Sequence, residues 1–252
     1  MMTSNSFKRF LIVAILISLS CVGFARTYLV AVGIADYPGT ESDLNLTAND
    51  AREVVEVYKN NQSLTHVLLT NSEATVDRID RAITQVFAQA KKDDIVIFFF
   101  SGHGYNGGFC AYDGNITYKR VRQAMSKSKC TNKMMFIDAC HSGGIRHESS
   151  NNNQNNNNHH DNGDLRSANV MILLSSRTTE VSYERADMKC GYFTTYLTRA
   201  LRGEADKNAD NIVTARELFE FVNTGVAQFS GDKQHPVMWG RFSNDMPVIK
   251  LR

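Results

Sequence analysis

The sequence has almost no excess of charge of either sign. Its 252 residues include 28 Lys and Arg and 26 Asp and Glu, which gives a formal net charge of +2. Lys8 and Arg9 fall in the first 25 residues, which contain no acid, so the remainder of the chain is formally neutral. A balanced chain has no basic surface of the kind that attracts nucleic acid or an anionic membrane. We therefore expect no nucleic-acid partner.

The chain also lacks the regular cysteine spacing of a disulfide-stabilised domain. Four of its five cysteines follow the first 25 residues, and they are scattered: Cys110, Cys130, Cys140 and Cys190. If one of these is a free nucleophile, at most one bridge can form among the other three. The length is enough for one domain with an apolar core of ordinary size.

A long membrane-spanning run is missing as well. The apolar run 10–22 is shorter than the roughly 20 residues that a helix needs to cross a bilayer. Lys8 and Arg9 precede this run and small residues follow it up to Ala25, which is the pattern of a signal peptide over residues 1–25. We predict cleavage after Ala25, export to the periplasm or beyond, and no stable membrane span in the cleaved protein. An uncleaved anchor is the alternative.

Five apolar runs alternate with five segments of helical period. The apolar runs are 28–34, 66–69, 95–100, 134–137 and 170–174. The helical segments are 48–58, 75–90, 118–125, 193–201 and 215–229. Apolar runs without polar alternation are typical of strands that are buried on both faces of a mostly parallel sheet. The sequence therefore predicts an α/β fold, a three-layer sandwich with helices on both faces of the sheet, in one domain from residue 26 to residue 252.

One segment interrupts this pattern. Residues 147–164 contain no aliphatic, Phe, Tyr or Trp residue, and asparagine is their commonest residue, at eight of eighteen positions. Such a stretch buries too little apolar surface to offset the entropy cost of ordering, so we expect a disordered loop inside the domain. A long structureless loop between two clear strands usually serves a function.

Reactive side chains directly follow two of the predicted strands. Ser101-Gly102-His103-Gly104 follows one strand, and Asp138-Ala139-Cys140 follows the next. If the two strands pair in parallel, their ends lie about 5 Å apart, so imidazole and thiol meet at one edge of the sheet. A histidine can take the proton of the thiol and produce the nucleophilic thiolate. Each residue alone is more often a buried cysteine or a loop histidine, but their joint occurrence favours a catalytic pair.

The two motifs SGHG and DACHSGG resemble the histidine and cysteine boxes of the caspase-like cysteine peptidases, in particular metacaspases and their bacterial relatives. Further similar stretches are VGIADYP, NDAREV, LTNSEATVDRI and SSRTTEVSYE, so the resemblance covers nearly all of the chain after residue 25. It implies that Cys140 is the nucleophile and His103 the general acid and base. It also implies an oxyanion hole formed by the backbone N–H groups of Gly104 and Cys140.

The resemblance further implies an acidic pocket for the residue before the scissile bond. The matching positions are Asp50, Ser101 and Asp138. Two carboxylates at the base of one pocket favour a guanidinium or ammonium group and disfavour an acidic one. The alternative roles are a helix-start acid for Asp50 and a carboxylate that holds loop amides for Asp138.

We therefore expect an exported cysteine endopeptidase that cleaves peptide or protein substrates after Arg or Lys. Arg146 and Arg166 border the asparagine-rich segment, and in caspase-like enzymes this region is often cut during maturation, so self-cleavage after one or both is predicted. Two other classes stay open: a non-catalytic caspase-like binding domain, and a thiol-dependent transferase or amidase.

A second motif has the spacing of a twelve-residue calcium loop. Oxygen-bearing side chains fall at positions one, three, five, nine and twelve: Asp206, Asn208, Asp210, Thr214 and Glu217. Asn211 stands at position six, where such loops have glycine, and asparagine tolerates the left-handed conformation needed there. An Asp/Asn-rich turn with Thr214 as a helix cap is the alternative. The peptidase chemistry requires no cofactor, and calcium is the one candidate.

Overall fold

The computed structural model describes residues 25–61, 63–105, 107–139, 170–177, 180, 182–184 and 187–252. The predicted signal peptide and the asparagine-rich segment 147–164 therefore lie outside the described residues, apart from Ala25. Within the described residues, no helix is both long enough and apolar enough to cross a membrane.

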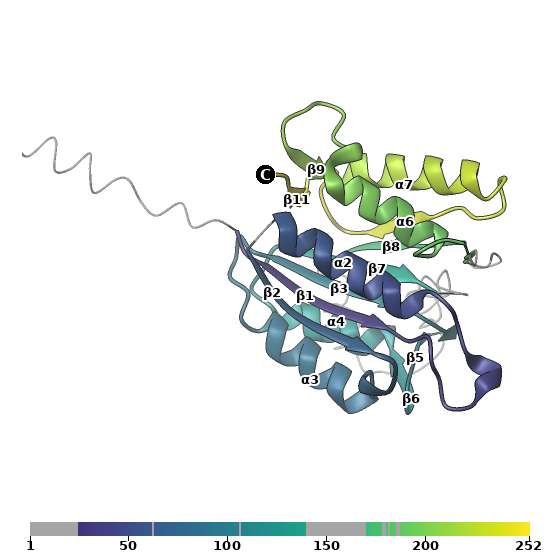
Figure 1. The fold of residues 1–252 in the computed structure, drawn as a ribbon. Helices are drawn as coiled ribbons and strands as arrows, with labels where there is room; N and C mark the ends of the chain where they lie inside the picture. The colour runs from purple at the N-terminus through teal and green to yellow at the C-terminus, as the bar shows by residue number, and fades with distance from the viewer. Residues whose placement is uncertain are drawn as a thin grey trace, which may run out of the picture.

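A six-stranded sheet forms the centre of the molecule, in the order β10-β8-β7-β3-β1-β2 (Figure 1). Its strands are β1 (Thr27–Gly33), β2 (Leu64–Thr70), β3 (Ile95–Ser101), β7 (Asn132–Asp138), β8 (Val170–Leu174) and β10 (Val237–Gly240). The first five are parallel to one another, and β10 pairs antiparallel with β8 at the edge. The five predicted strands and the mostly parallel sheet are confirmed, whereas β10 was not predicted.

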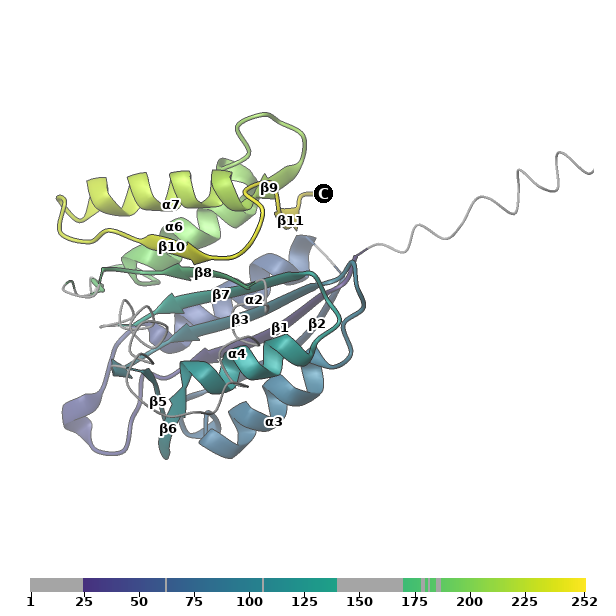
Figure 2. The same cartoon turned by 180° about the vertical axis from the view of Figure 1, so that it is seen from behind.

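Helices cover both faces of this sheet. On one face lie α2 (Thr47–Asn61), α6 (Tyr192–Arg199) with the wider helical turn η4 (Ala200–Glu204), and α7 (Ala215–Phe229). On the other face lie α3 (Val76–Phe87) and α4 (Tyr118–Lys127), which Figure 2 shows in front of the sheet. All five predicted helices are present, and the three-layer sandwich is confirmed.

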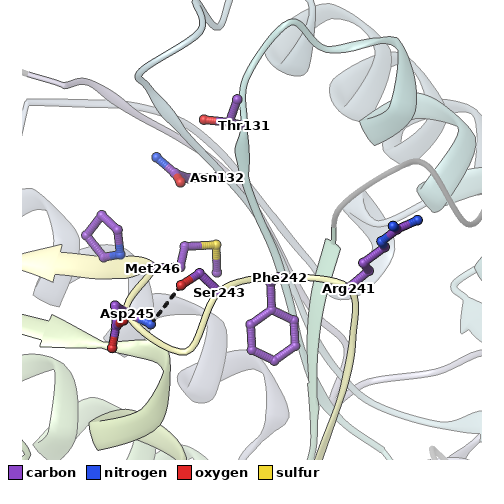
Figure 3. Close-up of a pocket in the computed structure, with 8 residues that line it drawn as sticks. Thr131, Asn132, Arg241, Phe242, Ser243, Asp245 and Met246 are labelled. Atoms are coloured by element: carbon purple, nitrogen blue, oxygen red, sulfur yellow. Dashed lines mark hydrogen bonds between the residues drawn. The ribbon is translucent and has the colours of Figure 1, made fainter.

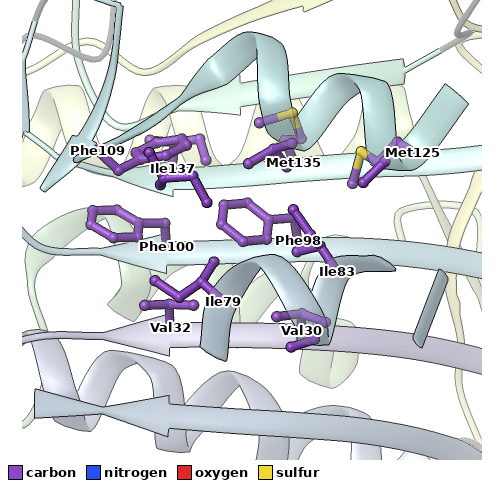
Figure 4. Close-up of a cluster of buried hydrophobic side chains, with 14 of the residues drawn as sticks. Val30, Val32, Ile79, Ile83, Phe98, Phe100, Phe109, Met125, Met135 and Ile137 are labelled. Atoms are coloured by element: carbon purple, nitrogen blue, oxygen red, sulfur yellow. The ribbon is translucent and has the colours of Figure 1, made fainter. Parts of the chain in front are cut away.

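The apolar runs become strands because their side chains alternate between two cores. In β3, Phe98 and Phe100 point to the core under α3 and α4, where Ile79 and Ile83 meet them (Figure 4). The intervening Phe99 belongs to the core on the α2 side. All three phenylalanines are fully buried, and burial of each stabilises the fold by roughly 1.5–3 kcal/mol. A strand with two buried faces has no room for a polar side chain until it ends.

Several short strands and helices were not predicted from the sequence. They are β4 (Gly104–Tyr105), β5 (Gly108–Ala111) and β6 (Gly114–Thr117) in a three-stranded sheet, β9 (Ile212–Thr214) paired with β11 (Pro247–Lys250), and the short helices η1 (Thr40–Ser42) and η2 (Asn71–Glu73). Strands of two to four residues are too short to show a two-residue period. The first of these sheets directly follows His103, so it continues the edge of the site.

The strands of the main sheet end together at one edge. Gly33 pairs with Ser101, and Ser101 in turn pairs with Asp138. A Cβ on Gly33 would stand 2.3 Å from the carbonyl oxygen of Thr47, so only glycine lets the start of α2 pack this closely on β1. That close approach brings the first turn of α2, with Asp50, to the ends of β3 and β7.

Candidate functional site

A pocket of about 180 Å³ lies at the carboxyl ends of β3 and β7. Residues from five parts of the chain line it: Leu44, Thr47, Asp50, Ser101, Gly102, His103, Asp138, Ala139, Ser182, Tyr183, Glu184 and Gly191. Four residues predicted from the sequence thus share one pocket, namely His103, Asp50, Ser101 and Asp138. The predicted nucleophile Cys140 lies outside the described residues, as do the predicted cleavage positions Arg146 and Arg166. Ala139, the residue before Cys140, lines the pocket.

The imidazole of His103 is anchored through one of its nitrogens. Its Nε2 atom lies 2.8 Å from the carbonyl oxygen of Ser42 in η1. A carbonyl oxygen can only accept, so Nε2 carries the hydrogen and Nδ1 keeps its lone pair. The ring is thereby held in the tautomer whose Nδ1 can accept a proton.

Tyr37 holds the backbone of the same histidine. The His103 N–H donates to the Tyr37 hydroxyl oxygen at 2.9 Å, and this hydroxyl donates to the carbonyl oxygen of Cys110 at 3.1 Å. The two rings also pack together, with 4.8 Å between their centroids. Burial raises the pKa of Tyr37, so the phenol stays protonated and keeps both bonds. The sequence did not predict a role for Tyr37. Its only signal was its position in the stretch VGIADYP, which is part of the family resemblance.

The N–H of Gly104 is not used by the neighbouring strand. Gly104 pairs with Phe109 in the antiparallel β4–β5 ladder, and the flanking hydrogen bond runs from Cys110 N to the carbonyl oxygen of His103 at 2.9 Å. This pattern makes Gly104 and Phe109 a non-hydrogen-bonded pair, whose N–H groups point away from the partner strand. The predicted oxyanion donor at Gly104 is consistent with this geometry.

Asp50 is almost completely buried in the first turn of α2, with 1% of its surface exposed. Its carboxylate accepts hydrogen bonds from the Ser101 hydroxyl at 2.7 Å and from the Gly191 N–H at 3.0 Å. The position at a helix start is the one that its alternative interpretation requires. Its partners, however, come from β3 and from the residue before α6, and the carboxylate faces the pocket.

Asp138 ends β7 and is also buried. Its carboxylate accepts from the Thr194 hydroxyl at 2.9 Å and from the Ser182 hydroxyl. Both partners belong to the chain between β8 and α6 or to α6 itself. Ser182 lies in the quoted stretch SSRTTEVSYE, but no role had been predicted for this residue, and no motif pointed to Thr194 or Gly191. Their contacts with Asp138 and Asp50 join segments that are distant in the sequence.

The two carboxyl groups approach the same point. A Cβ on Gly191 would stand 3.2 Å from Oδ2 of Asp138 and 3.7 Å from Oδ2 of Asp50. The two Oδ2 atoms are therefore no more than about 7 Å apart, and at that separation two like charges repel by roughly 2 kcal/mol at an effective dielectric constant of about 20. Burial and the charge of Asp138 raise the pKa of Asp50 to about 8, and burial raises the pKa of Asp138.

The connection between β8 and α6 is tied to the pocket by two further side chains. Glu184 accepts from the backbone N–H groups of Asn45 and Leu46, at 3.3 Å each. Gln234 is fully buried; its side-chain oxygen accepts from the Tyr183 N–H at 3.0 Å, and its amide donates to the Ser175 carbonyl oxygen at 2.9 Å. These bonds give the pocket wall a defined shape.

The predicted calcium loop lies away from this pocket, between η4 and α7. Asp206 accepts from the N–H groups of Asp210 and Asn211, at 3.3 and 3.0 Å. Asn211 has φ of 63°, as expected for position six. Thr214 and Glu217 form a capping box at the start of α7, which satisfies the alternative interpretation. Among the described residues, no group of three or more His, Cys, Asp or Glu side chains is arranged to hold a metal ion, so calcium binding stays a prediction.

Another pocket, of about 500 Å³, opens at the opposite edge of the sheet (Figure 3). It is formed by the start of β7 and the chain between β10 and β11: Thr131, Asn132, Arg241, Phe242, Ser243, Asp245, Met246 and Pro247. Its lining includes no cysteine or histidine and only one carboxylate. Of these two pockets, the one at the carboxyl ends of the strands contains the histidine and the carboxyl pair.

Comparisons with known proteins show which family the chain resembles. A model of the caspase domain matches residues 26–246. Metacaspase-4 of Arabidopsis thaliana is 28% identical over 144 residues, an alignment that covers 48% of this chain and 34% of that protein. This chain therefore spans about a third of the length of that relative.

Two solved structures share the fold. Caspase-1 from Spodoptera frugiperda superposes with a TM-score of 0.64 and 16% identity, over 88% of this chain and 90% of that one. Protein GSU0716 from Geobacter sulfurreducens does so with a TM-score of 0.64 and 18% identity, over 90% of this chain and 97% of that one.

Replacing Tyr37 by Phe should loosen the segment that carries His103. The change leaves the partly buried His103 N–H and Cys110 carbonyl without this partner, which should lower the free energy of unfolding by about 1–2 kcal/mol. Urea unfolding measures the loss, and hydrogen exchange of the His103 amide should become faster. Tyr58→Phe is the matched control, since the buried Tyr58 hydroxyl makes only a 3.5 Å contact with the Val248 carbonyl oxygen. Equal losses in the two variants would contradict the special role of Tyr37.

Proposed function

The chain belongs to the caspase-domain family of cysteine peptidases, as its two boxes predicted, and on this premise we propose that it is an endopeptidase with Cys140 as nucleophile and His103 as proton carrier. One observation carries the proposal. The pocket that holds His103 also holds Ala139, which precedes Cys140, and the carboxyl groups of Asp50 and Asp138.

The geometry of His103 supports its role as the base. Nδ1 keeps a lone pair because Nε2 donates to the Ser42 carbonyl oxygen. Nδ1 can therefore take the proton of the Cys140 thiol, and the thiolate then attacks the substrate carbonyl carbon. The same proton passes to the amine that leaves, and water releases the acyl group from the cysteine. The Gly104 N–H, which β5 does not use, can donate to the oxyanion.

The acidic pocket supports cleavage after Arg or Lys. Asp50 and Asp138 both contribute a carboxyl group to the pocket, and none of the described residues that line it is Lys or Arg. A cationic side chain can pair with these carboxyl groups, whereas an aspartate side chain would bring a further acid beside them. We propose arginine or lysine as the residue before the scissile bond.

Two further parts of the proposal rest on the sequence. The basic and apolar start of the chain supports export with cleavage after Ala25. The asparagine-rich segment, bordered by Arg146 and Arg166, supports self-cleavage, because an unstructured chain can enter an extended active site and the acidic pocket would accept either arginine.

A panel of peptides that differ only in the residue before the scissile bond tests the activity. We expect hydrolysis after Arg and Lys and none after Asp or Asn. Cys140→Ala and His103→Ala should each lower kcat/KM by at least about 10³-fold. Cys130→Ala is the control: this buried thiol bonds to the carbonyl oxygens of Asp94 and Asn132, and its loss should leave turnover unchanged.

Other results of the peptide panel would contradict parts of this proposal. Full turnover by Cys140→Ala would rule out the nucleophile, and cleavage after Asp but not Arg would sink the specificity. An unreactive thiol with no hydrolysis at all would favour a binding domain. Transfer or hydrolysis of simple amides without peptide cleavage would favour the transferase or amidase class.

Export predicts a defined first residue. When the full chain is produced in a host that secretes proteins, the purified protein should begin at Arg26, as intact-mass measurement can show. Recovery of the intact N-terminus in a membrane fraction would contradict cleavage and favour the retained anchor.

Self-cleavage predicts two fragments that stay associated, because β7 and β8 lie on opposite sides of the cut and pair in the sheet. Incubation of purified wild type should produce new termini after Arg146, Arg166 or both, detected by mass spectrometry. Cys140→Ala, incubated in parallel, should stay whole. A fully active wild type with an intact segment would refute maturation by cleavage and leave the peptidase assignment in place.

A further inference from the structure

The acidic pocket contains two buried carboxyl groups whose hydrogen-bond donors are neutral. Asp50 and Asp138 are 1% and 7% exposed, and both line the same pocket. Among the described residues, the groups that donate hydrogen bonds to them are neutral: the hydroxyls of Ser101, Ser182 and Thr194, the backbone N–H of Gly191 and the Cys190 thiol beside Asp50. Neutral donors stabilise one buried charge but do not neutralise two.

No cation of the protein compensates the pair within the described residues. Neither carboxyl group makes an ion pair with Lys or Arg in this part of the chain. The basic groups beside α6, Lys189 and Arg202, both pair instead with the carboxylate of Glu53. A second buried negative charge would therefore be unpaired, and a carboxyl group in that situation keeps its proton.

Gly191 lies close to both acids. A Cβ at this position would stand 3.2 Å from Asp138 Oδ2 and 3.7 Å from Asp50 Oδ2, so the two oxygens lie no more than about 7 Å apart. Both acids line the same pocket, so one cationic group that enters the pocket can interact with both. A cation there would replace the proton as the partner of the second carboxylate.

We propose that the empty pocket holds one proton on the Asp50–Asp138 pair, and that the cationic side chain of a substrate expels this proton to solvent when it binds. This inference rests on the proposed specificity for arginine or lysine. It adds that binding of the substrate is coupled to the release of one proton. One guanidinium enters, one carboxyl ionises, and one proton leaves.

The sign of the pH effect follows from the raised pKa of the pair. Burial and the charge of Asp138 raise the pKa of Asp50 to about 8. Just below this pH the empty pair holds a proton, and a cation binds best to the doubly ionised form. Affinity for a cationic side chain should therefore rise with pH, by up to tenfold per pH unit for one proton, and level off above about pH 8.

Within the part of the chain that the structure describes, four other titratable groups lie near the pair. His103 lines the pocket from the end of β3, and Tyr183 and Glu184 line it from the chain before α6. The Cys190 thiol stands against Asp50; burial and that carboxylate raise its pKa, so it stays protonated. A proton count must distinguish the carboxyl pair from His103 and Glu184.

The test uses Cys140→Ala protein, which cannot turn over, and an acetylated tripeptide that ends in arginine amide. The two are mixed in weakly buffered solution with a pH-indicator dye, and the protons released per bound peptide are counted. We expect close to one proton at pH 7 and almost none at pH 9.5. The matched peptide with citrulline, which has the shape of arginine without its charge, should release none.

Variants locate the proton. Adding Asp138→Asn or Asp50→Asn should abolish the release, and two positions are tested so that a folding defect in one leaves the other informative. Adding Glu184→Gln or His103→Ala should preserve it. If His103→Ala removes the proton instead, it belongs to the imidazole and the inference is wrong.

The outcomes separate this inference from the proposed function. Binding of the arginine peptide at pH 7 without proton release overturns the inference alone. Failure of the arginine peptide to bind, together with binding of an aspartate peptide, overturns both the inference and the specificity.

Discussion

β3 and β7 are hydrogen-bonded in parallel, with Ser101 opposite Asp138, and both strands end at the same level of the sheet. Parallel strands cannot be joined by a tight turn, so the chain must cross over between them. Here the crossover contains β4, β5, β6 and α4. The polar residues after each strand are therefore distant in sequence and adjacent in space. A slip of one residue would turn Asp138 away from the pocket, since successive side chains alternate between faces.

Around this edge, the pocket is completed by segments that have no strong structure of their own. Tyr37 binds the His103 segment to the chain at Cys110, and the Ser42 carbonyl oxygen orients the imidazole. Glu184 ties the chain before α6 to the start of α2. Each tie is a single side chain bonded to backbone, so the rigid sheet sets the position of the site and a few hydrogen bonds set its shape.

The sheet, its five parallel strands and the five helices could be predicted from sequence, because continuous apolar runs are typical of strands buried on both faces and a helical period indicates amphipathic helices. His103, Asp50, Ser101 and Asp138 could be placed together because strand ends meet at one edge. The sequence could not reveal Tyr37, Thr194 or Gly191. Tyrosine, threonine and glycine carry no chemical signal by themselves, and their roles come from contacts between distant segments. Short strands such as β4 and the antiparallel β10 also gave no periodic signal.

The carboxyl pair serves the fold as well as the pocket. Asp50 binds the Gly191 N–H, and Asp138 binds Ser182 and Thr194, so the two acids hold the start of α6 and the chain before it on the sheet. Those bonds need oxygen acceptors but not two negative charges. Asparagine retains an acceptor oxygen and loses the charge, and the Ser101 hydroxyl can reverse to accept from its amide. The negative charge of the two acids and their hydrogen bonds are therefore separable in this site. With one proton on the pair, Asp50 and Asp138 can still hold the wall of the pocket in place before a cation binds.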